Sequence, residues 1–277
     1  MVTTFREFKT GASVVSSAGA LKVRDRRDSR GLRTGFSLID VLVTMTVIAV
    51  LIGLLLPSLS MVQESARRVV CQSNIRQIGL GLVLYADDHG GKLPPSVFMQ
   101  PPGPGRGDPE PQHMLTLRVD PARAEFSSSW DGMGILFGSD YLTAPKLFDC
   151  PSHSGENTYS NYAKVWDDSA EELVANYHFR GAGPTGGGNP GVVRQLTYDL
   201  YKIDPAQSSL VADGMRIKSD YNHKVGVNFF RADLTVHWYS DPTGRLFDPM
   251  SQTKETAEPV GIIDAWLLFD LSANSAE

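Results

Sequence analysis

The chain holds two cysteines, Cys71 and Cys150, and their chemistry depends on whether they pair. In an oxidising compartment they can form a disulfide. That bond would close a loop of about 80 residues and contribute roughly 4–5 kcal/mol through loop-closure entropy. Two separate buried cysteines fit the sequence as well. Cys150 also has His153 three residues on, but this spacing is too common by chance to indicate a nucleophile and its base. The pairing stays open, and no catalytic residue is predicted.

A second group of reactive side chains lies nearer the C-terminus. His223, Asp233 and His237 could bind a metal or a ligand, but they lack the tight ligand spacing of zinc sites. The structural alternative is that His223 begins a strand and Asp233 caps a turn. The glycine-rich stretch 181–191 lacks the strand–turn–helix frame and the Lys-Ser/Thr pair of a nucleotide loop. The sequence therefore predicts no cofactor-binding or metal-binding residue.

The N-terminal segment that precedes these residues is unusually apolar. From Phe36 to Leu56 there are 21 residues with one charge, Asp40, near the start. About 20 apolar residues suffice for a helix to cross a bilayer. A carboxylate there costs roughly 2.5–3.5 kcal/mol at the helix centre, so it usually has a partner and a role. The segment predicts a transmembrane helix, and the preceding Gly35-Phe36 step, which follows a basic run, indicates a processing site.

Charge is distributed unevenly along the chain. Residues 1–35 carry eight basic and three acidic side chains, net +5, so the remainder carries net −10. Positive charge before a span keeps that side in the cytoplasm, so the C-terminal part is expected to be exported. An acidic mature domain also argues against a nucleic-acid partner.

These N-terminal residues resemble the start of type IV prepilins and type II secretion pseudopilins. The resemblance implies that a prepilin peptidase cuts between Gly35 and Phe36 and that Phe36 becomes N-methylated. It also implies that Asp40, which replaces the family's usual Glu, pairs with the N-terminal amine of a neighbouring subunit. Pro57 matches the proline that pilins often carry within the apolar run, where its missing N–H can kink or loosen a helix. An ordinary signal anchor is the alternative.

The stretch after this segment narrows the resemblance. Residues 71–79, Cys-Gln-Ser-Asn-Ile-Arg-Gln-Ile-Gly, are similar to the prepilin-like proteins abundant in planctomycetes, as are Tyr141-Leu142 and Cys150-Pro151-Ser152. Those proteins also carry a C-terminal His followed, after nine residues, by Asp-Gly. Here His223 and Asp233 match, but Leu234 stands in the place of the glycine.

Calcium is the one cofactor that the resemblance keeps open. Some pseudopilins bind it in a C-terminal loop, and this chain has an acidic run at 167–172, Asp-Asp-Ser-Ala-Glu-Glu. A solvent-facing helix N-terminus is the favoured interpretation of that run.

Periodicity predicts the elements that follow the span. Ile75, Ile78, Leu82 and Tyr85 form one apolar helix face. That helix is expected to end at His89-Gly90-Gly91, with glycine as its C-cap. Together with the span it makes one helix of about fifty residues. Residues 225–239 predict a β-hairpin turning at Arg231–Leu234, and because Leu234 disfavours φ > 0 a different loop from an Asp-Gly turn is expected.

Shorter segments complete the prediction. Val211–Met215 is interpreted as a strand followed by a turn, and the apolar tail from Ile262 as a final strand or short helix. A short helix near Trp130 is expected to be capped by Ser or Asp. Glu64 and Arg68 are four residues apart on the predicted helix, and this spacing favours an ion pair between them.

The predicted fold is therefore α+β and pilin-like: a long N-terminal helix, half in the membrane, packed on an antiparallel sheet with long loops. Its domains are a cytoplasmic basic leader that is cleaved (1–35), a transmembrane helix (36–57), the soluble half of that helix (58–90) and a periplasmic α+β domain (91–277).

The predicted function is structural. The chain is expected to be a single-pass protein of the bacterial inner membrane, with prepilin peptidase and other pilin-like subunits, itself or minor pseudopilins, as partners. It is expected to assemble into a type IV pilus or a type II secretion-like pseudopilus, and not to be an enzyme. The alternative is an anchored extracytoplasmic ligand-binding domain that does not polymerise.

Overall fold

The protein is described by a computed structural model covering residues 35, 37–99, 108–120, 129–166, 171–186, 195–253 and 256–272. The basic leader, Phe36 and most of the acidic run at 167–172 lie outside the described residues. The chain divides into two units, residues 1–52 and 53–277.

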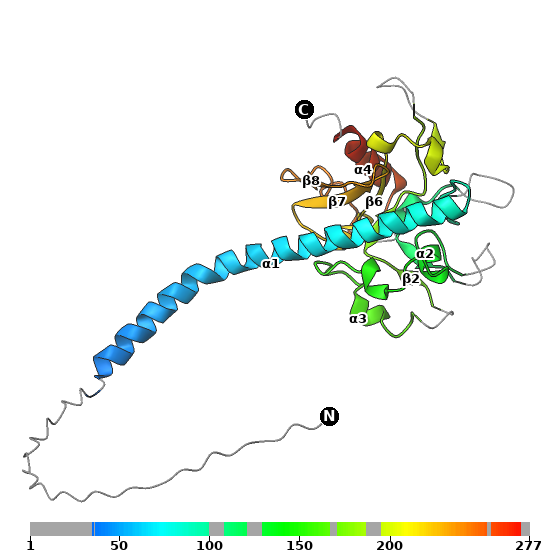
Figure 1. The fold of residues 1–277 in the computed structure, drawn as a ribbon. Coiled ribbons are helices and arrows are strands. Elements are labelled where there is room, and N and C mark those ends of the chain that lie inside the picture. The colour runs from blue at the N-terminus through cyan, green and yellow to red at the C-terminus, as the bar shows by residue number, and fades with distance from the viewer. Residues whose placement is uncertain are drawn as a thin grey trace, which may run out of the picture. The chain divides into compact units, whose positions relative to one another are not determined.

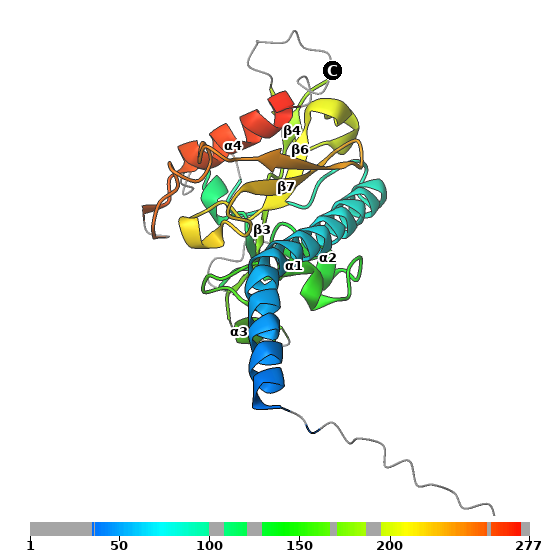
Figure 2. The same ribbon diagram turned by 90° about the vertical axis from the view of Figure 1, so that its left-hand side faces the viewer.

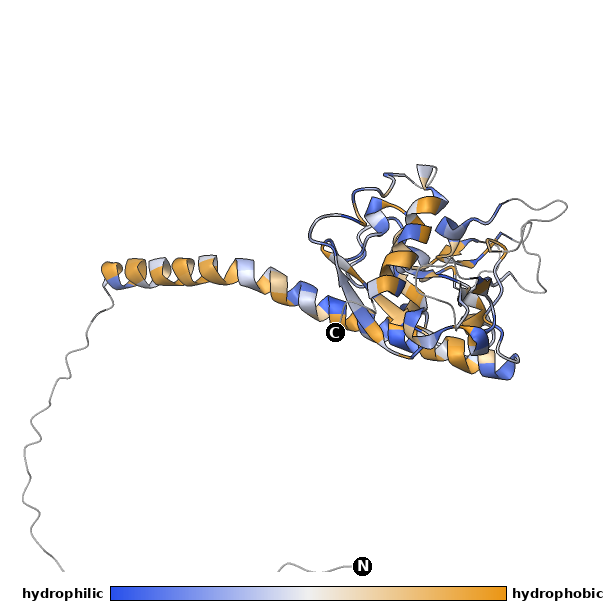
Figure 3. Cartoon of the chain, turned by 90° about the horizontal axis from the view of Figure 1, so that it is seen from above, coloured by the Kyte–Doolittle hydropathy of each residue, from blue (hydrophilic) through white to orange (hydrophobic). Residues whose placement is uncertain are grey.

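Helix α1 (Leu38–Asp88) has 51 residues and continues through Pro57, which confirms the predicted helix of about fifty residues (Figure 1). Apolar residues dominate its first half (Figure 3), where the side chains are exposed. Among the described residues α1 is the one helix that is long and apolar enough to cross a membrane.

The second half of α1 buries the predicted face. Ile75, Ile78 and Leu82 are fully buried, and Tyr85 nearly so. Two glycines on different sides of the helix let neighbouring side chains approach its backbone. A Cβ at Gly79 would lie 2.4 Å from the ring of Phe230, and one at Gly81 would lie 3.1 Å from Leu142. This half of α1 is therefore fitted closely to the domain.

The C-terminal end of α1 lies where the sequence predicted it. Gly90 and Gly91 have φ values of 62° and 84°, which glycine adopts without the steric penalty of a side chain. The Gly91 N–H donates to the Ala86 carbonyl over 2.7 Å, so the glycines terminate the helix as predicted.

The main sheet has four antiparallel strands in the order β3-β6-β7-β8. Their bounds are Tyr177–Phe179, Ser209–Asp213, Gly226–Arg231 and Val236–Ser240. Strands β7 and β8 form the predicted hairpin, with Val227 opposite Tyr239 and Phe230 opposite Val236.

Successive residues of these strands face opposite sides of the sheet. Val211 and Phe230 belong to the hydrophobic cluster that contains α1 residues, whereas Ala212 and Phe229 belong to a second cluster. The second cluster includes Trp266 and other residues of α4 (Pro259–Leu271). The sheet thus lies between the soluble half of α1 and α4 (Figure 2).

Smaller elements surround this core. Two further antiparallel pairs join β1 (Thr116–Arg118) to β2 (Leu173–Val174) and β4 (Gly183–Pro184) to β5 (Leu196–Thr197). The short helices are α2 (Gly134–Gly138) and α3 (Tyr159–Tyr162). The 3-10 turns are η1 (Pro111–His113), η2 (Pro145–Phe148), η3 (Leu200–Lys202), η4 (Pro205–Gln207) and η5 (Lys218–Asp220). The fold is α+β, as predicted.

The predicted cap of the short helix near Trp130 is wrong. The N-cap residue of α2 is Met133, and its side chain makes no capping hydrogen bond. Asp131 instead reaches across to residues 96 and 97, where it accepts hydrogen bonds from the Ser96 hydroxyl (2.6 Å) and the Val97 N–H (2.8 Å). The carboxylate fixes the loop after α1 to the start of α2.

A buried histidine gives the domain a defined sensitivity to acid. Burial lowers the pKa of His178 to about 3, although its hydrogen bond to Pro111 opposes that shift. The Pro111 carbonyl lies 3.0 Å from Nε2, and the Met215 N–H donates to Nδ1 over 3.3 Å. Nε2 is then the donor, and the neutral ring satisfies both contacts.

We expect the free energy of unfolding to fall between pH 6.5 and pH 3 because of His178. Over that range the unfolded chain binds a proton that the folded chain excludes, so stability is lost as the pH falls. The contribution is about 1.4 kcal/mol per pH unit, or roughly 3 kcal/mol at pH 4. Denaturant unfolding of the full chain in detergent at several pH values measures it.

The comparison that tests this is between His178→Gln and His89→Gln, since His89 is exposed. The first variant should lose the part of the acid dependence that comes from residue 178, and the second should keep it. Parallel pH curves for the wild type and His178→Gln would contradict the prediction.

Candidate functional site

His223 is placed by the segment between η5 and β7, and its side chain is buried. Its carbonyl accepts a hydrogen bond from the Gly226 N–H over 2.8 Å, at the beginning of β7. The ring packs edge-on against Trp238 of β8, with centroids 5.8 Å apart. His223 therefore lies three residues before β7 and, contrary to its structural interpretation, does not begin the strand. Both of its ring nitrogens point to polar partners.

The first partner comes from α1. His223 Nδ1 lies 2.6 Å from Glu64 Oε1, and the Ser152 hydroxyl donates to both Glu64 oxygens over 3.1 and 2.9 Å. Glu64 is still 44% exposed, so it links the buried ring to the surface. The predicted pairing of Glu64 with Arg68 is replaced: the Arg68 guanidinium lies over the Trp238 ring, 4.2 Å from its centroid.

The second partner is a disulfide. Cys71 of α1 and Cys150 are joined, with Cα atoms 5.4 Å apart, which settles the pairing that the sequence left open. Both cysteines are buried. Cys150 Sγ lies 3.7 Å from His223 Nε2. The bond attaches the soluble half of α1 to the loop that leads from η2 into the domain.

The third partner is Asp213, the last residue of β6. Its Oδ2 accepts hydrogen bonds from the backbone N–H (2.6 Å) and the side-chain amide (3.0 Å) of Asn228, and it lies 3.6 Å from His223 Nε2. Its Oδ1 is buried. Burial raises the pKa of Asp213, and the neighbouring His223 and the hydrogen bonds from Asn228 and Asn222 oppose that shift.

These groups form one buried cluster, which we call the Cys–His–Asp cluster: Cys71, Cys150, Asp213 and His223. One potential metal-ligand atom from each lies within 4.8 Å of the others. Glu64, His223 and Cys150 also follow the order of an orienting group, a base and a nucleophile. In the disulfide form, however, the sulfur carries no thiolate, which is the nucleophilic and metal-binding species.

The residues that the sequence grouped with His223 lie elsewhere. Asp233 is at the far end of β7, a strand of six residues, or roughly 17–20 Å. Its Oδ1 accepts hydrogen bonds from the Thr235 N–H and hydroxyl over 3.0 and 2.5 Å. His237 Nε2 lies 2.6 Å from the same hydroxyl. The three predicted residues are therefore divided between two places.

The hairpin turn corrects one expectation. Leu234 has φ of 69°, the left-handed conformation that leucine was expected to avoid. The turn closes with hydrogen bonds from the Leu234 N–H to the Arg231 carbonyl and from the Arg231 N–H to the Thr235 carbonyl. These bonds and the Asp233 side chain offset the local strain, which is of order 1–3 kcal/mol for such a residue.

The remaining predicted residues lie at the start of α1. Gly35 is exposed and precedes the helix, whereas Phe36 is outside the described residues. Asp40 lies in the first turn, where its Oδ2 accepts a hydrogen bond from the Ser37 N–H over 3.0 Å. Pro57 lies inside the helix.

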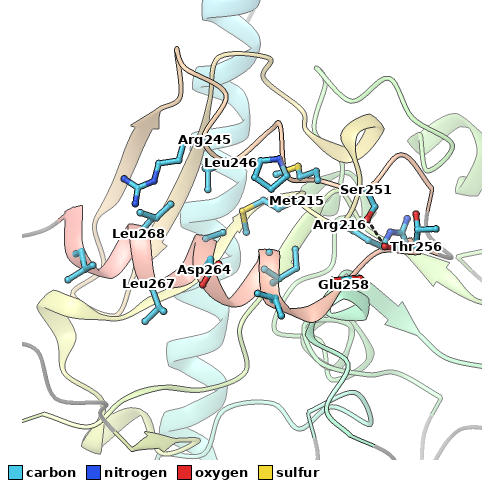
Figure 4. Close-up of a pocket in the computed structure, with 17 residues that line it drawn as sticks. Met215, Arg216, Arg245, Leu246, Ser251, Thr256, Glu258, Asp264, Leu267 and Leu268 are labelled. Atoms are coloured by element: carbon cyan, nitrogen blue, oxygen red, sulfur yellow. Dashed lines mark hydrogen bonds between the residues drawn. The ribbon is translucent and has the colours of Figure 1, made fainter.

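The sequence did not indicate a cavity that lies beside α4. A pocket of about 750 Å³ lies between α4 and the segments that contain Arg216 and Arg245, and Figure 4 shows side chains of α4 lining one side of it. Arg216 is held by Asp220 at 2.9 Å. Apolar α4 residues such as Leu268, together with Glu258, give the pocket a mixed lining.

Glu64 and Asp213 were also missed as site residues. Glu64 and Cys71 are seven residues apart, or about two helical turns, and so lie on one face of α1. That spacing was the available signal. For Asp213 there was none beyond its position at the end of a strand.

No curated protein and no solved structure matches this chain. A family described as Protein of unknown function (DUF1559), SBP_bac_10, matches residues 61–220. The match includes Glu64, Cys71, Cys150 and Asp213 and covers more than half of the chain. The chain therefore belongs to the DUF1559 family.

Proposed function

We propose that this chain is a membrane-anchored, pilin-like structural subunit. A prepilin peptidase cuts it between Gly35 and Phe36, and the first half of α1 holds it in the bacterial inner membrane. The domain faces the periplasm. Mature subunits assemble with copies of themselves or with other pilin-like subunits into a type IV pilus or a type II secretion-like pseudopilus.

One observation carries this proposal: the apolar half of α1 has a lone carboxylate, Asp40, in its first turn. The surrounding side chains are exposed and apolar, as expected for a segment surrounded by lipid. A carboxylate at a helix N-terminus gains from the helix dipole, yet one hydrogen bond from Ser37 leaves part of its accepting capacity unused. The amine that cleavage creates on Phe36 of a neighbouring subunit would supply the missing cation.

The pairing of Asp40 with the Phe36 amine favours associated subunits over isolated ones. A buried ion pair offsets its desolvation only when the geometry is good, and an unpaired buried charge is strongly unfavourable. Subunits inserted without a neighbour would leave Asp40 uncompensated, so the carboxylate favours association. The proposal assigns the chain no catalytic step and no nucleic-acid partner. It requires no cofactor, and calcium is not part of it.

Replacing Asp40 by alanine is expected to abolish assembly without preventing cleavage. The variant should still lose its leader, measured by mass spectrometry of the mature N-terminus. Amine-reactive cross-linking in membranes should no longer capture subunit pairs, because the cation on Phe36 has lost its partner.

Asp40→Glu is the matched control, since it keeps the charge and restores the residue usual in pilins. It should cross-link at least as well as the wild type. Undiminished cross-linking of Asp40→Ala, or recovery of the native chain with its first 35 residues attached, would overturn the proposal.

The pocket beside α4 favours a second candidate function. Its volume of about 750 Å³ falls in the range of small-molecule sites, and a mixed lining with arginines suits an anionic amphipathic ligand. In that case the chain would be an anchored ligand-binding domain, and Asp40→Ala would leave its function unchanged. Loss of binding on Arg245→Ala, with unchanged cross-linking of Asp40 variants, would favour this candidate.

A further inference from the structure

We propose that the Cys–His–Asp cluster is a redox-controlled zinc site: when the disulfide is reduced, Cys71, Cys150, His223 and Asp213 bind one Zn²⁺. This inference is independent of the proposed assembly function. It concerns four buried side chains that come from α1, β6 and two loops, and that lie together in the folded chain.

The donor set matches the metal. Zinc in proteins is bound by thiolates, imidazoles and carboxylates, usually four of them in a tetrahedron. Two sulfurs, one nitrogen and one carboxylate oxygen from this cluster already lie within 4.8 Å of one another. Thiolate ligands disfavour the hard cations Mg²⁺ and Ca²⁺, so the class of ligand is a thiophilic divalent cation.

The spacing of the cysteines suits both states. With Zn–S bonds of about 2.3 Å, two thiolates on a tetrahedral zinc lie about 3.8 Å apart. Cα atoms separated by 5.4 Å accommodate that distance by rotation of the two side chains. Reduction therefore requires no large movement of α1 away from the loop at Cys150.

Groups around the cluster already orient the ligands. Glu64 holds His223 Nδ1 at 2.6 Å, which directs Nε2 toward the sulfurs. A carboxylate behind a ligating histidine is the usual arrangement at protein zinc sites. Asn228 fixes Oδ2 of Asp213 through two hydrogen bonds.

The Asp213 carboxylate is the second observation that points to a ligand. The side chain is buried, and its Oδ2 faces the cluster, 3.6 Å from His223 Nε2. A buried charge without a full counter-charge is costly. A cation bound by this carboxylate, His223 and the two sulfurs would compensate that charge.

The redox step balances with a dithiol as the reductant. The dithiol loses two electrons and two protons and becomes a cyclic disulfide, while the Cys71–Cys150 bond is broken and two thiols form. Zinc then binds the two thiolates, and their two protons are released to solvent. Because the bound sulfurs cannot reoxidise while they hold the metal, zinc and the disulfide exclude each other.

Cobalt binding to the full chain in detergent tests this inference. Co²⁺ substitutes for Zn²⁺, and its visible and near-ultraviolet absorption reports tetrahedral geometry and thiolate ligands. The chain is reduced with a dithiol that is removed anaerobically before titration. We expect one Co²⁺ per reduced chain, displaced by Zn²⁺, and none in the oxidised chain.

Variants distinguish cobalt binding by all four residues of the cluster from binding by the two cysteines alone. His223→Ala and Asp213→Asn should each lose the tetrahedral spectrum while both cysteines remain. Glu64→Gln should weaken binding about 10–100-fold, as for other groups behind a ligand. His237→Gln is the matched control and should bind like the wild type.

Folding is followed in the same samples by near-ultraviolet circular dichroism. If the reduced chain unfolds, cobalt should restore its folded spectrum. The proposal is overturned if the reduced chain binds no cobalt, if it stays unfolded with cobalt bound, or if His223→Ala and Asp213→Asn keep the wild-type absorption.

Discussion

Gly134→Ala is expected to lower the free energy of unfolding by about 3 kcal/mol or more, an effect typical of severe overpacking. A Cβ at residue 134 would lie 1.8 Å from the Leu117 carbonyl oxygen and 2.8 Å from its Cα. The obstacle is backbone, so no side-chain rotation relieves the clash. Helix α2 and strand β1 would have to move apart, and Leu117 and Leu136 of the core would move with them. Denaturant unfolding of the full chain in detergent measures the change.

Gly261→Ala is the matched control for that variant. Gly261 lies in helix α4, and a Cβ there would meet nothing within 4 Å. Alanine is favoured over glycine inside a helix by up to about 1 kcal/mol, so this variant should be as stable as the wild type or more so. Equal midpoints for the two variants would show that α2 is not packed as closely as described.

The second large effect is expected from the disulfide. Cys71→Ala combined with Cys150→Ala should lower the free energy of unfolding of the oxidised chain by about 4–5 kcal/mol, because the open chain regains the entropy of a loop of about 80 residues. Each single variant should lose a similar amount, since either change breaks the same bond. Unfolding curves under oxidising conditions measure all three proteins.

Reduction supplies the independent check. With a reductant and a chelator present, the wild type should fall close to the double variant, while the double variant itself should not respond. A wild type whose stability is unchanged by reduction would contradict this prediction, and so would single variants that lose far less than the double one.

Local patterns were enough to predict the helix and the hairpin. The spacing of Ile75, Ile78 and Leu82 specifies one face of a helix, and the two glycines after His89 specify its end. For residues 225–239, alternation with a central polar turn specifies a hairpin. These features depend on neighbours a few residues away, so a single sequence contains the information.

The cluster around His223 could not be predicted in this way. Glu64 is 159 residues from His223, and its contact depends on how α1 packs against the sheet. The i,i+4 rule therefore paired Glu64 with Arg68, although burial of His223 next to α1 outweighs a surface ion pair worth a few tenths of a kcal/mol. The prediction that Leu234 avoids positive φ was wrong for a related reason. The hydrogen bonds around the turn outweigh the backbone preference of leucine.

The contact between Gly79 and Phe230 has a consequence for how this protein meets others. The ring occupies the space where a side chain on α1 would be, so the helix cannot turn about its own axis without pushing backbone into the ring. Leu80 and Leu84, which remain exposed, are thereby held at a fixed angle by a residue some 150 positions later in the chain. Phe230 acts here together with the disulfide at Cys71, so a core side chain and a covalent bond jointly determine which apolar side chains a neighbouring molecule encounters.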